Sequence, residues 1–145
     1  MVTCLDVARY ILEKQGAMSA MKLQKLVYYA QAWSLVWDER PLFREPIKAW
    51  ANGPVVPRLY GAHRGRFRVS ANDIAGDSST LDARARATIG KVLAFYGKRT
   101  AQWLSDLSHR EKPWMDAREK LAPGERGGGV ITHAALAEFY GSLAD

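Results

Sequence analysis

The sequence predicts a mostly α-helical fold: a single compact helical domain over residues 1–145, with a minor, short β-ribbon in its middle segment. Apolar residues recur at helical spacing before residue 38 and again after residue 80. Between residues 38 and 57, four prolines and one glycine interrupt regular structure. The chain has 145 residues, 48% of them hydrophobic, which suits one hydrophobic core and one domain.

The N-terminal segment predicts two helices. Apolar residues at helical spacing stop before Gly16, which predicts a first helix over residues 4–15. Ser19 is a residue type favoured at helix N-caps and predicts the start of a second helix. A long apolar and aromatic face carries this second helix to about residue 37.

The middle segment predicts short, irregular elements. Residues 47–51 and residues 66–70 both alternate loosely between apolar and polar side chains, which favours two short strands paired as a ribbon. Pro54 suits the first turn of a short helix that continues to Tyr60. The Asn52-Gly53-Pro54 corner predicts a tight turn, because glycine tolerates a positive φ and proline fixes the next φ.

The C-terminal half returns to helical patterns. Apolar spacing predicts a helix over residues 81–96, and Thr100 is a candidate N-cap for the next one. Pro113 is expected to begin a further short helix that reaches Leu121. Residues 121–145 are predicted to form a glycine-rich loop, mainly residues 123–129, and a final helix capped by Thr132.

The net charge of +6 is concentrated in one segment. Residues 46–72 hold five Lys or Arg side chains and no Asp or Glu, whereas the rest of the chain is nearly balanced. This distribution excludes a uniformly basic nucleic-acid-binding coat and leaves a local basic segment.

The sequence carries no pattern typical of catalysis. Cys4 is the only cysteine, which excludes an internal disulfide and a cysteine-based zinc site. The three histidines are far apart, and the glycines spell no phosphate-binding loop. We therefore expect no enzyme activity, no cofactor and no metal. The charged N-terminus and the lack of long apolar runs predict a cytoplasmic protein without a signal peptide or a membrane span.

Two features favour binding. Residues 4–37 resemble a helix-turn-helix, which would make the protein a DNA-binding regulator, although a helix so rich in aromatics is more typical of a core. The basic segment fits an acidic protein surface, a phosphate backbone or a solvated loop, and these alternatives stay open at this point.

Several blocks of the sequence resemble the SocA-type antitoxin family, whose domain is called Panacea and whose members are often labelled phage-associated proteins. The blocks are residues 21–33 (MKLQKLVYYAQAW), 41–43 (PLF), 50–60 (WANGPVVPRLY) and 104–109 (LSDLSH), followed by Pro113, Trp114 and Ala117. The resemblance, including the order and spacing of these blocks, covers about residues 3–120.

The resemblance implies a small helical antitoxin that neutralises a co-encoded toxin by direct protein–protein binding. One known member acts instead as a proteolytic adaptor that delivers its toxin to the ClpXP protease. The alternatives are the DNA-binding regulator and a phage-encoded host-interaction protein.

Partner contacts are expected where arginines and aromatic side chains gather, because such residues anchor protein interfaces. The candidates are Arg58, Arg64, Arg66, Phe67 and Arg68, followed by Tyr29 and Trp37 if the second helix leaves them exposed.

Overall fold

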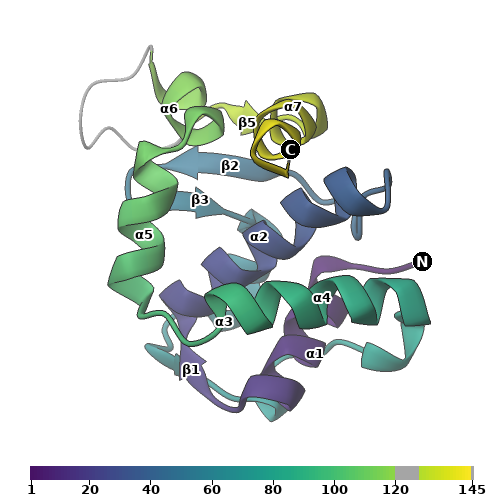
Figure 1. Cartoon of the computed structure of the whole chain (residues 1–145). Coiled ribbons are helices and arrows are strands. Elements are labelled where there is room, and N and C mark those ends of the chain that lie inside the picture. Colours follow the sequence, from purple (N-terminus) through teal and green to yellow (C-terminus); the bar gives the residue numbers. More distant parts are fainter. Residues whose placement is uncertain (120–127, 145) are drawn as a thin grey trace.

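The computed structural model describes residues 1–119 and 128–144, and it confirms a mostly α-helical fold with a small β component (Figure 1). The helices are α1 (Cys4–Gln15), α2 (Ala20–Trp37), α3 (Pro57–His63), α4 (Ala83–Tyr96), α5 (Ala101–Arg110), α6 (Lys112–Arg118) and α7 (His133–Ala144). The strands are β1 (Met18–Ser19), β2 (Ile47–Trp50), β3 (Gly53–Val55), β4 (Arg68–Val69) and β5 (Val130–Ile131). Two 3-10 turns, Ala71–Asp73 and Ser78–Thr80, lead into α4.

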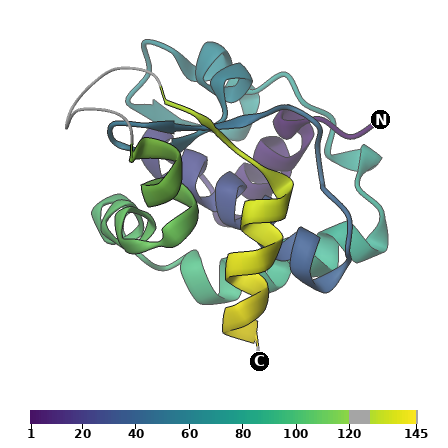
Figure 2. The same cartoon turned by 90° about the horizontal axis from the view of Figure 1, so that it is seen from above.

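Helix α2 forms the centre of the molecule. It packs against α1, α4, α5 and α7, which surround it in both views (Figures 1 and 2). Residues 23–32 of α2 are all buried, including the polar side chains Gln24, Lys25 and Gln31, because neighbouring elements cover the helix on every side. A DNA-recognition helix needs a face that is free to enter a groove, and this part of α2 offers none.

The first two helices lie where their capping residues predict. Thr3 caps α1, because its hydroxyl accepts a hydrogen bond from the amide of Asp6, whose carboxylate in turn accepts from the amide of Thr3. Ser19 caps α2 by accepting from the amide of Lys22. The predicted bounds of residues 4–15 and of the helix ending at residue 37 are confirmed.

The predicted pairing of the two middle strands is wrong. β2 pairs in antiparallel fashion with β3 and with β5, whereas β4 pairs with β1. Gly53 has a φ of 123°, so the chain turns back directly and β2 meets its immediate neighbour in sequence. Pro54 is consequently a residue of β3, and the following helix α3 begins at Pro57.

Side-chain caps begin helices α4, α5 and α7, whereas α6 has no side-chain cap. Asp82 caps α4, and the predicted caps Thr100 and Thr132 are confirmed at the starts of α5 and α7. Residues 120–127, which contain Leu121 and most of the predicted glycine-rich loop, lie outside the described residues. None of the helices within residues 1–119 and 128–144 is long and apolar enough to cross a membrane.

Candidate functional site

Residues 64–68, which we call the basic loop, form an exposed segment between α3 and β4. All five residues are exposed, and the ring of Phe67 is 79% accessible to solvent. Arg64, Arg66 and Arg68 flank this ring along the chain. The loop therefore presents a large apolar side chain among cationic ones.

Hydrogen bonds at several points tether the basic loop to the fold. The carbonyl of Phe67 accepts from the amide of Ala20 at 2.9 Å, and the guanidinium of Arg68 donates to the carbonyl of Ala17 at 3.2 Å. Arg66 forms an ion pair with Asp73 at 3.3 Å. A tethered backbone reduces the conformational entropy that binding would remove.

Arg58, another predicted contact residue, lies on α3 and is tied to the body of the protein. Its guanidinium meets Glu45 Oε2 at 2.8 Å, and Glu45 Oε1 accepts from the backbone amide of Cys4 at 3.2 Å. Arg58 thus joins α3 to the start of α1. Burial and the nearby Glu45 carboxylate raise the pKa of the Cys4 thiol, which keeps it protonated and unreactive.

Tyr29 and Trp37 are contact candidates only if helix α2 leaves them exposed, and this condition holds for Trp37 alone. Tyr29 is fully buried, stacked on Tyr96 with ring centroids 4.1 Å apart, so its prediction as a contact residue is wrong. The aromatic composition of α2 reflects core packing at this position. Trp37, near the end of α2, is 38% exposed and stacks on Trp33 at 4.8 Å.

A cavity of about 430 Å³, which we call the aromatic pocket, opens beside Trp37. Its lining comes from α2, α4, α5, α7 and the α5–α6 junction: Trp33, Trp37, Lys91, Val92, Phe95, Tyr96, Trp103, Leu107, Glu111 and Leu143. This volume lies in the range of small-ligand and side-chain binding pockets. Of the predicted site residues, the pocket contains Trp37.

A buried hydroxyl network ends at the floor of the aromatic pocket. Glu111 Oε1 accepts hydrogen bonds from the hydroxyl of Tyr29 at 2.7 Å and from that of Tyr140 at 2.8 Å. Because the Tyr140 proton is used there, the hydroxyl of Tyr28 donates to Tyr140 at 2.9 Å. Burial raises the pKa of the Glu111 carboxyl.

A second buried charged group, Lys25, lies under the tight turn at Gly53. The Nζ atom of Lys25 is 3.4 Å from the carbonyl of Pro54, and burial lowers the pKa of Lys25 to about 8. The neighbouring Gln24 accepts from the amide of Val56 at 2.9 Å and donates to its carbonyl at 3.3 Å. The turn is thereby fixed to α2.

Other polar groups do not converge on a site. His63 contacts Gln24, His109 stacks on Trp114, and His133 contacts Gln31, so the fold does not bring the histidines together. Within the described ranges, no group of three or more His, Cys, Asp or Glu side chains could hold a metal ion.

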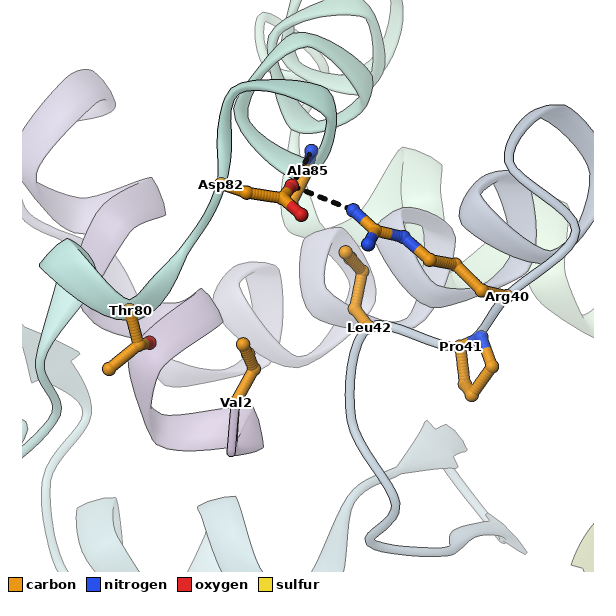
Figure 3. A pocket seen from close by; sticks show the side chains of 7 residues that line it. All are labelled: Val2, Arg40, Pro41, Leu42, Thr80, Asp82 and Ala85. Atoms are coloured by element: carbon orange, nitrogen blue, oxygen red, sulfur yellow. Dashed lines mark hydrogen bonds and ion pairs between the residues drawn. The ribbon is translucent and has the colours of Figure 1, made fainter.

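A second cavity, of about 70 Å³, is lined by residues that belong neither to the basic loop nor to the aromatic pocket: Val2, Arg40, Pro41, Leu42, Thr80, Asp82 and Ala85 (Figure 3). The ion pair of Arg40 with Asp82, 2.7 Å long, spans it.

Comparison with known proteins places these features in a family. The family described as "Antitoxin SocA-like, Panacea domain" matches residues 23–115, more than half of the chain. Antitoxin SocA of Caulobacter vibrioides (strain NA1000 / CB15N) is 32% identical over 124 aligned residues. The alignment covers 74% of this chain and 66% of that relative, so the chain spans just under two thirds of the relative's length. No solved structure matches the chain. The matched range contains α2, the turn at Gly53, the basic loop and Glu111, and the chain belongs to the SocA-like antitoxin family.

Proposed function

We propose that this protein is the antitoxin of a toxin–antitoxin system and neutralises a co-encoded toxin by binding it directly. Membership of the SocA-like family supports this function, as does the similarity to Antitoxin SocA of Caulobacter vibrioides. The structural observation that carries the proposal is the basic loop, where an exposed Phe67 is flanked by arginines on a tethered backbone.

The chemistry of the basic loop suits a protein partner better than a partner that is bound through charge alone. Aromatic and arginine side chains dominate the energetic centres of protein interfaces. A phenyl ring that is 79% exposed has an unfavourable contact with water, which a partner surface would remove. Arg64 and Arg66 add attraction toward an acidic surface and accelerate the encounter.

The mechanism we propose is occlusion of the active surface of the toxin, without a chemical step by the antitoxin. Cys4, the only cysteine of the sequence, is buried and held as a thiol, which supports binding as the mode of action. Delivery of the bound toxin to the ClpXP protease is a variant of the same proposal, since it requires the same first contact.

Co-expression with the neighbouring open reading frame tests the proposal. Growth arrest by the neighbour alone, with rescue by this protein, is the expected result. A neighbour that is harmless alone, or an arrest that this protein does not relieve, would overturn the antitoxin assignment. Rescue that depends on ClpXP would identify the adaptor variant.

A charge-reversal variant tests the contact surface. Replacing Arg64, Arg66 and Arg68 by Glu should weaken toxin binding by roughly a hundredfold, because attraction becomes repulsion at three positions. The matched control reverses the exposed Arg44, Lys98 and Lys112, which lie outside the basic loop. Equal loss in both triple variants would show a net-charge effect and remove the basic loop as the contact.

A further inference from the structure

The aromatic pocket combines apolar walls with a charged group at its floor. Trp33, Tyr96 and Trp103 contribute indole and phenol rings, and Leu107 and Val92 complete the apolar lining. Glu111 is 7% exposed and is part of the same lining. A carboxylate in such surroundings is poorly solvated, so a group that compensates its charge would bind favourably.

One oxygen of Glu111 is available for such a group. Both tyrosine hydroxyls donate to Oε1. Within residues 1–119 and 128–144, Glu111 Oε2 accepts no hydrogen bond from the protein. The hydroxyl network holds the carboxylate in place while Oε2 remains free to accept from a ligand.

The rings at the rim of the aromatic pocket already attract cations. Lys91 Nζ lies 5.1 Å from the centroid of Trp37, and the guanidinium of Arg99 lies 4.4 Å from that of Trp103. Both cations are exposed side chains, and Lys91 is part of the pocket lining, so solvent and salt screen their repulsion toward an incoming charge. Their positions show that the ring faces suit cation–π contacts.

The geometry points to the aromatic pocket as a binding site for a basic side chain, best an arginine, presented by a partner protein. The aliphatic stem would lie against Leu107 and Val92, the guanidinium would stack on the indole rings, and its N–H groups would donate to Glu111 Oε2. Arginine fits better than lysine because its planar head can stack on an indole ring while an N–H group in its plane donates to Glu111 Oε2. This inference rests on the proposed function only for the identity of the partner.

The site can be tested without the toxin. The probes are N-acetyl-arginine N-methylamide and the neutral isostere N-acetyl-citrulline N-methylamide, titrated into the full-length protein and followed by the indole N–H resonances in NMR. The arginine probe should bind roughly tenfold more tightly than the citrulline probe, consistent with a cation–π contact plus a hydrogen-bonded ion pair. The indoles of Trp33, Trp37 and Trp103 should shift, whereas those of Trp50 and Trp114, outside the pocket, should not.

Two variants separate the site from a general structural effect. Glu111→Gln should abolish the preference for arginine over citrulline, whereas Glu138→Gln, at an exposed position on α7, should leave it unchanged. Trp103→Leu keeps an apolar wall and should weaken the arginine probe severalfold even if Glu111→Gln fails to fold.

Replacing a cationic side chain at the rim of the aromatic pocket should raise, rather than lower, the affinity for the arginine probe. Lys91→Met should tighten the arginine probe, because it removes a like charge at the mouth of the pocket. Equal affinity for arginine and citrulline in the wild-type protein, or tighter binding of N-acetyl-glutamate N-methylamide, would overturn the inference. Those results would leave the growth-rescue test of the antitoxin function unaffected.

Discussion

The basic loop and the aromatic pocket are two surfaces of opposite construction. The basic loop is five consecutive residues, its charged side chains lie in solvent, and hydrogen bonds to the backbone of Ala17 and Ala20 fix its position. The aromatic pocket is assembled from segments between Trp33 and Leu143, and its charge is buried beneath rings.

The difference determines how each surface responds to mutation and to salt. Side chains of the basic loop can change with little effect on the fold, because little packs against them. Side chains around the aromatic pocket also form the core, so a substitution there affects stability and binding together. Salt screens exposed charges much more than buried ones. Binding through the basic loop should therefore weaken as salt rises, whereas a contact with Glu111 should persist.

The largest effect is expected on the pocket side. Tyr29→Ala removes a fully buried ring and one donor to Glu111, and should lower the free energy of unfolding by about 3–5 kcal/mol. Urea denaturation followed by circular dichroism measures this change. Tyr29→Phe keeps the ring and should cost about 1–2 kcal/mol. A Tyr29→Ala protein of unchanged stability would contradict the buried position of this ring.

The buried Lys25 predicts a pH dependence of stability. Its pKa is lowered by burial to about 8 in the fold, against 10.5 in an unfolded chain. Between these two values the unfolded state binds more protons at Lys25, so the contribution of Lys25 to stability rises with pH, by up to roughly 3 kcal/mol. The stabilisation is lost again as pH falls through the folded pKa. The raised pKa of the Cys4 thiol acts in the opposite direction above its ordinary value of 9.0, so the Lys25 contribution is the difference between the wild-type protein and Lys25→Met. Chemical denaturation at a series of pH values tests this slope, and Lys25→Met should remove it. An equal slope in both proteins would assign it to other groups.

The tight turn between β2 and β3 should tolerate a side chain poorly. Gly53→Ala places a Cβ 2.7 Å from Cε of Lys25 at a φ of 123°, and should destabilise the fold by about 1–3 kcal/mol. Gly61→Ala is the matched control, because Gly61 lies inside α3 with nothing within 4 Å of the added Cβ. That control should stabilise slightly, by about 0.5–1 kcal/mol. Thermal melting of both variants compares them, and equal melting temperatures would contradict the crowding at Gly53.

The smallest effect on stability is expected in the basic loop. Phe67→Ala should change the free energy of unfolding by less than about 0.5 kcal/mol, because the ring is largely solvated. The same substitution should weaken toxin binding roughly tenfold. Calorimetric titration of the toxin, with a melting curve of the free variant, separates the two quantities. Unchanged affinity would leave the arginines as the active part of the basic loop.

Local signals predicted the helices well and the strand pairing poorly. The caps at Ser19, Thr100 and Thr132 are contained in a few consecutive residues, and each one is confirmed. Strand pairing depends on which segment, often distant in sequence, forms backbone hydrogen bonds with the edge of a strand. The alternation at residues 47–51 could not show that β5 supplies the second partner of β2, because that partner lies more than eighty residues later.

The two candidate sites differ in the same way in how far local sequence predicts them. The basic loop was predictable because its charges are adjacent in sequence. The aromatic pocket was not, because Phe95, Trp103 and Leu143 meet only after α4, α5 and α7 have packed around α2. Tyr29 was misjudged for the same reason, since its exposure depends on Tyr96 and Tyr140 from later helices.

The hydroxyl network also has a consequence for folding during synthesis, because its members are far apart in the chain. Tyr28 and its partner Tyr140 are 112 positions apart in the chain. When α1 through α6 have been synthesised, the central helix of the nascent chain therefore still lacks its last aromatic cover. Until α7 is synthesised and docks, that surface is exposed to chaperones and proteases. The lifetime of this intermediate would set how soon after translation the protein becomes active.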